Sequence, residues 1–256
     1  MENIHSFIHF TCIGILCLAS IFPITAQSNL FTYHTFKNEA GDSLQYRRLV
    51  SDYGEDLAHP LVIFLHGVGE RGADNEAQLQ WGVKNFAADR ILKTYKPVVI
   101  VPQCPADDYW SNLDFEGVAF KPTPTRTMAL LEELIRETIA TLSIDPNRVY
   151  ITGLSMGGYG TFDALSRYPD LFAAAMPVCG AGDPKMAEKF AHIPTWIFHG
   201  VQDNTVVPQH ATDMYQALIA AGAYPGMTIY PDTGHFSWIA AYSDPSTLDW
   251  LFSKSK

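Results

Sequence analysis

The sequence predicts an α/β fold, in which one domain is built on a mostly parallel sheet of eight strands with helices on both faces. Apolar runs of strand length alternate with helical patterns along the 256-residue chain, and this alternation is typical of a parallel sheet. The runs are mostly continuous rather than alternating, which predicts strands buried on both faces. The expected strands are 31–36, 44–50, 61–65, 98–101, 149–151, 173–178, 195–198 and 227–230, and the expected helices are 75–92, 124–142, 156–167, 209–221 and 238–252.

The first two strands are the exception to the parallel arrangement. Segments 31–36 and 44–50 alternate polar and apolar residues on either side of the turn 38–42, which predicts an antiparallel hairpin. Further along, Asp145-Pro146-Asn147 is expected to end the helix 124–142, and Gly222 is expected to stop the helix 209–221.

The N-terminal segment resembles an export signal. It is apolar from Phe10 to Phe22 and ends in small residues at Ala26, so we expect residues 1–26 to be a signal peptide and 27–256 to be a single catalytic domain. The first nine residues contain no Lys or Arg, which leaves an uncleaved membrane anchor as the alternative. The expected location is secreted or periplasmic.

Charge and cysteine content narrow the possible partners. The formal net charge is −10 and no Lys/Arg cluster occurs, so we expect neither a nucleic-acid partner nor a stable membrane partner. After signal cleavage Cys104 and Cys179 remain. They follow strands that should lie too far apart for a disulfide, so we expect two buried free thiols.

A serine lies where a strand should turn sharply into a helix. Gly153-Leu154-Ser155-Met156-Gly157 joins the strand 149–151 to the helix 156–167. Glycines on both sides of the serine allow two backbones to approach and expose the hydroxyl, as a nucleophile elbow requires. Ser155 is therefore the candidate nucleophile.

A nucleophilic serine needs a histidine base and an acid that orients the histidine, each at the carboxyl end of a strand. His235 follows the strand 227–230, whereas His199 is expected to pack or bond locally. Asp203 follows the strand 195–198 and is the favoured acid. Asp183 and Asp232 remain alternatives, although each could be an ordinary turn residue.

Two backbone N–H groups should stabilise the oxyanion. We expect them from Met156, directly after the nucleophile, and from Val68 in the glycine-rich loop 65–72. Glu70 and Arg71 in that loop could contact a polar substrate, but an ion pair that braces the loop is the preferred interpretation. The loop lacks the Lys-Ser/Thr ending of a phosphate-binding loop.

Substrate contacts are less well defined. Trp81, Trp110 and Trp238 could stack on a sugar or an aromatic acyl group, or could simply belong to the core. The segment 103–123, with Trp110, Phe115 and Phe120, either shapes a pocket or packs on its own domain. The short stretch between Cys179 and Ile193 leaves no room for a large lid domain.

These residues together resemble the α/β-hydrolase esterases around polyhydroxybutyrate depolymerases, feruloyl and acetylxylan esterases and the hydrolase domain of prolyl oligopeptidases. The matching segments are His66-Gly67-Val68-Gly69-Glu70-Arg71-Gly72, Val101-Pro102-Gln103, Asp145-Pro146-Asn147-Arg148-Val149-Tyr150, 153–160, His199-Gly200 with Asp203 and Val207-Pro208, and His235-Phe236-Ser237-Trp238. The resemblance implies an α/β-hydrolase fold, the catalytic residues Ser155, Asp203 and His235, and oxyanion donors at Val68 and Met156.

We therefore expect a secreted serine esterase that forms an acyl-enzyme and acts on short-chain or carbohydrate-linked acetyl or feruloyl esters. The expected partner is a small-molecule or oligosaccharide ester. No metal and no organic cofactor is expected, because the serine chemistry needs neither. A serine peptidase acting on short peptides and a non-catalytic binding protein that keeps the fold remain alternatives.

Overall fold

A computed structural model describes residues 30–53, 58–114 and 118–256 of the chain. The predicted signal peptide and Phe115 lie outside the described residues. No helix in the described ranges is both long enough and apolar enough to cross a membrane.

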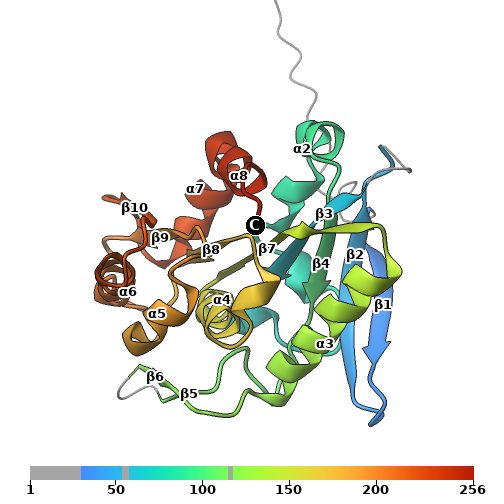
Figure 1. Cartoon of the computed structure of the whole chain (residues 1–256), viewed down its shortest axis with the longest axis horizontal. Helices are drawn as coiled ribbons and strands as arrows, with labels where there is room; N and C mark the ends of the chain where they lie inside the picture. The colour runs from blue at the N-terminus through green and yellow to red at the C-terminus, as the bar shows by residue number, and fades with distance from the viewer. Residues whose placement is uncertain (1–29, 54–57, 115–117) are drawn as a thin grey trace, which may run out of the picture.

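The described residues form an eight-stranded sheet whose strand order is β1-β2-β4-β3-β7-β8-β9-β10 (Figure 1). The first two strands pair antiparallel, β2 also pairs antiparallel with β4, and the remaining neighbours are parallel. The strands are β1 Thr32–Lys37, β2 Ser43–Val50, β3 His59–Leu65, β4 Val98–Pro102, β7 Ile144–Leu154, β8 Ala174–Val178, β9 Trp196–Gly200 and β10 Gly226–Tyr230. The predicted mostly parallel sheet and its opening hairpin are confirmed.

Helices cover both faces of this sheet, and each face has its own apolar core. Alternate residues of β3 point to opposite faces. Leu61 and Ile63 therefore pack in one core, with α3 Arg126–Thr141, α4 Met156–Arg167, α5 Ala187–Phe190 and α6 Gln209–Ala220. Val62 and Phe64 pack in the other, with α2 Asp89–Thr94, α7 Trp238–Ser243 and α8 Pro245–Phe252.

Short elements fill the connections. They are the 3₁₀ helices η1 Val68–Glu70, η2 Ala77–Leu79, η3 Val83–Ala87, η4 Pro169–Leu171, η5 Pro184–Met186 and η6 His235–Ser237, and a small separate hairpin of β5 Leu113–Asp114 and β6 Ala119–Phe120. Between β8 and β9 the chain forms only η5 and α5, so the structure agrees with the absence of a large lid there.

The prediction of one helix over 75–92 is wrong. This stretch instead contains η2, η3 and α2, and Gly82 between the first two has a φ of +71°. A Cβ at Gly82 would lie 2.5 Å from the ring of Tyr242, so the close packing of α7 against the turn requires glycine there.

Two further boundaries differ from expectation. The helix predicted over 238–252 is two helices, α7 and α8, because Pro245 disfavours helical backbone at Asp244 and begins the second helix. Asp145-Pro146-Asn147 does not end a helix. Instead, α3 already ends at Thr141 and these residues belong to β7. Gly222, with a φ of +84°, follows α6 as predicted.

Candidate active site

Ser155 occupies a sharp turn between β7 and α4. Its φ of 53° and ψ of −117° are unusual for a residue with a side chain, and such strain is characteristic of functional turns. The turn brings Gly157 against β3, where a Cβ would lie 2.0 Å from the carbonyl oxygen of Leu65. The glycine therefore lets the backbones meet, and the serine side chain lies at the carboxyl end of the sheet.

Three side chains that follow three different strands meet in a hydrogen-bonded row. His235 Nε2 lies 2.9 Å from Ser155 Oγ, and His235 Nδ1 lies 2.7 Å from Asp203 Oδ2. Ser155 follows β7, Asp203 follows β9 and His235 follows β10. The structure thus brings together the serine, histidine and acid that the sequence favours.

Asp203 is buried, and its carboxylate accepts several hydrogen bonds. Its Oδ1 accepts hydrogen bonds from the backbone N–H groups of Thr205 and Val206, at 2.8 and 2.9 Å. Burial pushes the pKa of Asp203 upward, but the bonds from His235, Val206 and Thr205 outweigh burial and hold the pKa below its usual value. The ionised carboxylate needs a donor from His235, so Nδ1 carries the proton and Nε2 can accept the Ser155 hydroxyl proton.

The alternative acid Asp183 is engaged elsewhere. It caps η5 by accepting from the Lys185 N–H, and its other oxygen accepts from the Phe120 N–H. Asp232 is exposed, and no hydrogen bond links it to the histidine. His199 bonds locally to the Val206 carbonyl, as expected, and also lies 3.2 Å from Asp203 Oδ2.

The two candidate oxyanion donors begin helical elements. Met156 is the first residue of α4 and Val68 is the first residue of η1, and helix N-termini leave backbone N–H groups unpaired. In the described ranges neither N–H has an intramolecular acceptor.

Both residues line a cavity of about 250 Å³ with Ser155. The rest of its lining is Tyr109, Ser111, Tyr159, Thr205 and Val206. A larger hollow of about 580 Å³ lies at the opposite edge, before β9 and β10, and contains none of these groups.

The loop that carries Val68 is braced by a buried histidine. His66 Nδ1 donates to the Gly67 carbonyl at 2.6 Å, and its Nε2 accepts from the Cys104 N–H at 2.9 Å. Burial lowers the pKa of His66 to about 4, so the ring is neutral. Trp110 Nε1 donates to the His66 carbonyl at 3.0 Å, which ties the loop to the core.

The expected ion pair between Glu70 and Arg71 is wrong. Among the described residues these two side chains form no ion pair. Burial raises the pKa of Glu70, which accepts from the Gly67 N–H and from its own N–H. Arg71 donates to the carbonyls of Val68 and Asp108, at 3.3 and 3.1 Å. Each side chain thus braces the loop separately, through backbone groups.

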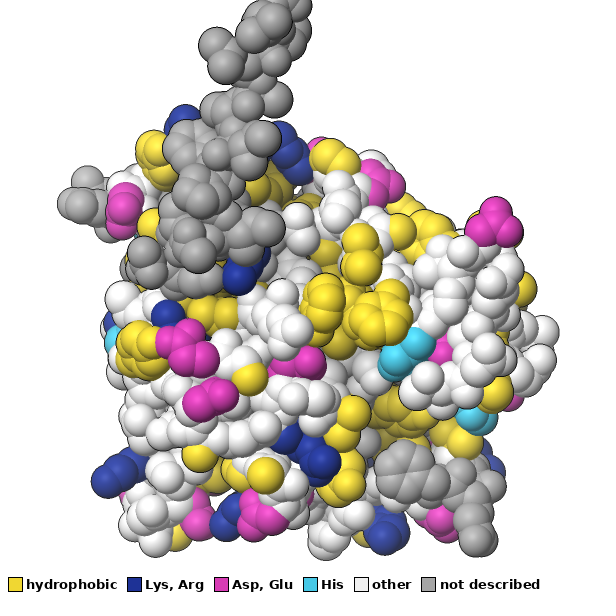
Figure 2. Space-filling view, turned by 180° about the vertical axis from the view of Figure 1, so that it is seen from behind, with side chains coloured by type: hydrophobic (Ala, Val, Ile, Leu, Met, Phe, Trp, Pro, Cys, Tyr) yellow, Lys and Arg dark blue, Asp and Glu magenta, His cyan; other side chains and the backbone are white. Residues whose placement is uncertain are grey.

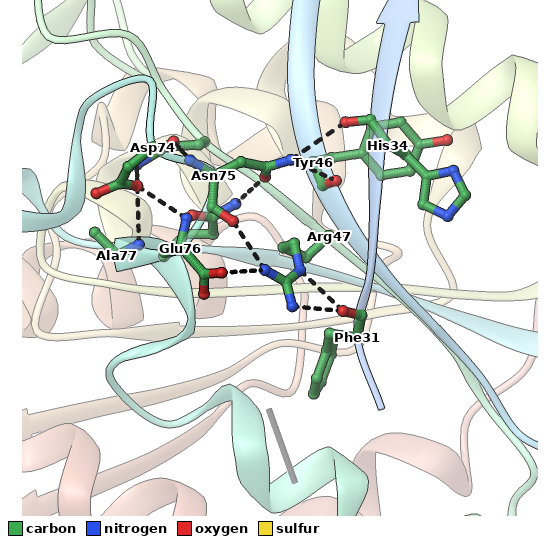
Figure 3. A network of polar contacts seen from close by, with 10 residues as sticks. Phe31, His34, Tyr46, Arg47, Asp74, Asn75, Glu76 and Ala77 are labelled. Atoms are coloured by element: carbon green, nitrogen blue, oxygen red, sulfur yellow. Dashed lines mark hydrogen bonds and ion pairs between the residues drawn. The ribbon is translucent and has the colours of Figure 1, made fainter. Parts of the chain in front are cut away.

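A polar network connects the same loop to the N-terminal hairpin. Gln103 donates to the Glu70 carbonyl and to Asp74, and its oxygen accepts from the Asn75 N–H at 2.7 Å. Figure 3 shows buried Arg47 of β2 on the other side of Asn75, bonded to the Asn75 carbonyl at 3.1 Å, to the Phe31 carbonyl and to Glu76. Sequence reasoning missed this network, because its members are far apart along the chain.

The three tryptophans have different surroundings. Trp110 is fully buried, so the prediction that it contacts substrate is wrong and its core role holds. Trp238 is buried with its ring 5.3 Å from that of His235, and Trp81 is half-buried with its ring 6.1 Å from that of Trp238. Phe236 packs near both, with its ring 6.0 Å from that of Trp81 and 4.6 Å from that of Trp238, and it is 55% exposed. Its place directly after His235 was the only sequence signal for it.

These rings form an aromatic rim, Trp81, Phe236 and Trp238, on the histidine side of the site. Figure 2 shows that hydrophobic side chains gather in the middle of the rear face, next to a histidine side chain. The segment 103–123 has both of its expected roles, since Trp110 and Phe120 pack in the core while Tyr109 and Ser111 line the cavity.

Cys104 and Cys179 are buried free thiols, as predicted. In the parts of the chain that are described, no group of His, Cys, Asp and Glu side chains has the arrangement of a metal site.

The chain is similar to known esterases. Residues 50–244 match the family described as phospholipase/carboxylesterase. Poly(3-hydroxyalkanoate) depolymerase C of Paucimonas lemoignei is 32% identical over 187 residues, which cover 72% of this chain but only 40% of the relative. A solved thermostable esterase is 36% identical with a TM-score of 0.83, over 90% of this chain and 64% of that one. A ferulic acid esterase, 16% identical with a TM-score of 0.65, shares the fold over 87% of this chain and 96% of its own.

Proposed function

Because the chain belongs to the phospholipase/carboxylesterase family, we propose that it hydrolyses carboxylic esters through an acyl-enzyme on Ser155. The observation that carries this proposal is the row from Ser155 through His235 to Asp203, with contacts of 2.9 and 2.7 Å. Such a row raises the nucleophilicity of a serine hydroxyl, which is otherwise a weak nucleophile.

In the proposed reaction, Ser155 Oγ attacks the ester carbonyl while His235 Nε2 takes the hydroxyl proton. The carbonyl oxygen becomes an oxyanion that faces the N–H groups of Val68 and Met156. His235 then gives its proton to the departing alcohol, and the C–O bond to that alcohol breaks. A water molecule repeats the sequence on the acyl-serine, which releases the carboxylic acid and restores Ser155. Asp203 keeps His235 in the required tautomer and stabilises its charged form.

We propose short-chain or carbohydrate-linked esters, such as acetyl and feruloyl esters, as substrates. A cavity of about 250 Å³ beside Ser155 suits a small acyl group better than a long lipid chain. Its lining includes Tyr109, Ser111 and Thr205, residues whose hydroxyl groups can bond polar substituents. The aromatic rim lies on the side from which His235 must protonate the alcohol. Exposed Phe236 and half-buried Trp81 there can pack on a sugar or aryl ring, with buried Trp238 behind them.

A polyester oligomer is the second candidate substrate, because the Paucimonas relative is a depolymerase and is 32% identical. Neither a peptide substrate nor a purely binding role has comparable support. The peptidases with a similar structure have 15–17% identity and share only the fold. A binding protein would have no need for the hydrogen-bonded row.

The experiment is turnover of a substrate panel with Ser155→Ala as the test variant. The panel contains p-nitrophenyl acetate, longer p-nitrophenyl esters, methyl ferulate, acetylated xylan, a 3-hydroxybutyrate oligomer and a dipeptide amide. We expect turnover of short esters that falls at least about 10³-fold in Ser155→Ala. Ser111→Ala, which alters the same cavity without touching the row, should keep most of the activity. Equal turnover by Ser155→Ala would refute the assignment, and preferential amide cleavage would replace the esterase with a peptidase.

We also propose that the protein is exported, with residues 1–26 removed and 27–256 kept as one catalytic domain. The apolar stretch from Phe10 to Phe22 and the small residue Ala26 support this proposal. Mass spectrometry of the exported protein should find Gln27 at its N-terminus. An intact N-terminus in a membrane fraction would favour the anchor instead.

A further inference from the structure

We propose that His199 is a positioning residue that holds the Asp203 carboxylate in place for His235. This inference rests on the proposed function, because it assigns a role within the same site. It concerns a second imidazole on the acid, one that does not touch substrate.

His199 lies at the end of β9, fully buried and four residues before Asp203. Its Nε2 lies 2.8 Å from the Val206 carbonyl oxygen and 3.2 Å from Asp203 Oδ2. The Val206 N–H in turn donates to Asp203 Oδ1 at 2.9 Å. His199, Asp203 and Val206 therefore close a ring of contacts, in which the imidazole fixes both the carboxylate and the turn that holds it.

The chemistry of the partners determines the tautomer of His199. A carbonyl oxygen only accepts hydrogen bonds, so Nε2 must carry the proton that points to Val206 and lies beside Asp203. Burial lowers the pKa of His199 and outweighs the Val206 carbonyl and Asp203, which both raise it. The ring is therefore a neutral donor. Asp203 Oδ2 lies next to two imidazole N–H groups, one from His235 and one from His199.

Packing alone does not explain a histidine at this position. Within the described residues, His199 Nδ1 is buried and has no hydrogen-bond partner, which is an unfavourable situation for a polar atom. An apolar side chain of similar size would fill the space without that orphan acceptor. Unlike an apolar side chain, the imidazole places its Nε2–H beside Asp203 and the Val206 carbonyl. This contact accounts for a histidine at this position.

The other titratable groups near Asp203 are neutral and add no charge beside its carboxylate. Burial raises the pKa of Tyr159 on α4, and burial raises the pKa of Cys179, after β8, to about 12. Both therefore stay neutral at the pH of an esterase assay. His199 and His235 each present a donor to the carboxylate.

Removing the His199 donor should change the pH profile as well as the rate. A donor beside a carboxylate favours its charged form, so its loss raises the proton affinity of the coupled pair Asp203–His235. The acid limb of kcat/KM should then move to higher pH. The carboxylate also loses its fixed orientation, so kcat should fall while KM changes little.

The test compares three variants in p-nitrophenyl acetate hydrolysis between pH 5 and 9. In His199→Leu we expect kcat to fall roughly tenfold and the acid limb to rise by about half a pH unit. His199→Gln places an amide N–H where Nε2 lies, so it should restore most of both properties. Phe198→Leu is the matched control, because it disturbs the same strand on its other face. It should reduce the unfolding midpoint but leave the acid limb unchanged.

Three outcomes would overturn the inference. They are an unshifted acid limb in His199→Leu, a shift of the same size in Phe198→Leu, and a His199→Gln variant as impaired as His199→Leu. If His199→Leu does not fold, His199→Asn replaces it, since its shorter amide cannot reach Asp203. A wild-type protein that hydrolyses no ester and does not react with a fluorophosphonate would contradict the proposed function instead.

Discussion

The two sides of the candidate site are held in place in different ways. The oxyanion loop, residues 66–77, is fixed by side chains from distant parts of the chain, namely Arg47, Gln103 and Trp110. The acid loop, residues 203–206, is fixed by the N–H groups of Thr205 and Val206, which bond Asp203, and by His199 on the adjoining strand. The acid loop is thus a local construction, whereas the oxyanion loop depends on the rest of the fold.

The acid loop therefore takes part in the reaction directly, whereas the side chains around the oxyanion loop support it structurally. The acid loop contains a residue that acts directly on His235, so damage there should remove activity in one step. Support of the oxyanion loop is shared among several side chains, so damage to one of them should cost stability and part of the rate. Three predictions test this contrast.

The largest effect is expected from Asp203→Asn. The amide cannot offer His235 the negative charge, and the wrong imidazole tautomer becomes favoured, so kcat should fall by about 10⁴-fold with little change in KM. Steady-state kinetics on p-nitrophenyl acetate measure this. Asp183→Asn is the control, since Asp183 also follows a strand and caps a turn but lies outside the row. A comparable loss in Asp183→Asn would make Asp183 the acid instead.

Gln103→Leu should have a smaller effect on rate and a clear effect on stability. It leaves the Glu70 carbonyl and the Asn75 N–H without their buried partner, which costs about 3 kcal/mol of unfolding free energy. Loosening of the loop should lower kcat by roughly tenfold. Thr138→Val, a buried change on α3 away from the site, controls for stability loss alone. If Gln103→Leu reduced kcat as much as Asp203→Asn, the contrast between the loops would not hold.

The smallest effect is a pH dependence of stability due to His66. Its pKa is about 4 in the folded state, against an ordinary value of 6.5, so the unfolded chain binds the proton first as the pH falls. Stability is therefore complete above about pH 6.5 and decreases toward pH 4, in total by about 3 kcal/mol. Urea unfolding at several pH values measures the slope.

The matched variant is His66→Gln, which has no ring to titrate. It should be less stable at pH 7 and should lose less of its remaining stability between pH 6.5 and 4 than the wild type does. Identical slopes in the two proteins would show that His66 is not the brace that the distances describe.

The same contrast explains what the sequence could predict. The sequence could predict Ser155, Asp203 and His235 because each follows a strand, in a recognisable order, and the carboxyl ends of parallel strands meet at one edge of the sheet. The sequence could also predict where α4 begins, because a glycine-flanked turn precedes the helix. These features depend on neighbours in sequence.

Features that depend on distant residues were missed. The stretch 75–92 has helical spacing, but Tyr242 packs on Gly82 and a turn interrupts the helix there. The local sequence pattern does not predict that contact. Glu70 and Arg71 look like an ion pair in sequence, yet each finds a backbone partner instead. The burial of Trp110 depends on Gly160, fifty residues later, which leaves room for its side chain, so the sequence left both the core and the surface open for it.

The burial of Cys104 and Cys179 has a practical consequence for labelling. Both thiols are inaccessible, and burial raises the pKa of each to about 12, so almost none of either exists as the reactive thiolate. In a protein without residues 1–26, which contain Cys12 and Cys17, a single cysteine introduced at an exposed position such as Ile239 would therefore react with a maleimide dye without competition. A fluorophore placed there, on the helix that follows His235, could report the arrival of substrate at the aromatic rim.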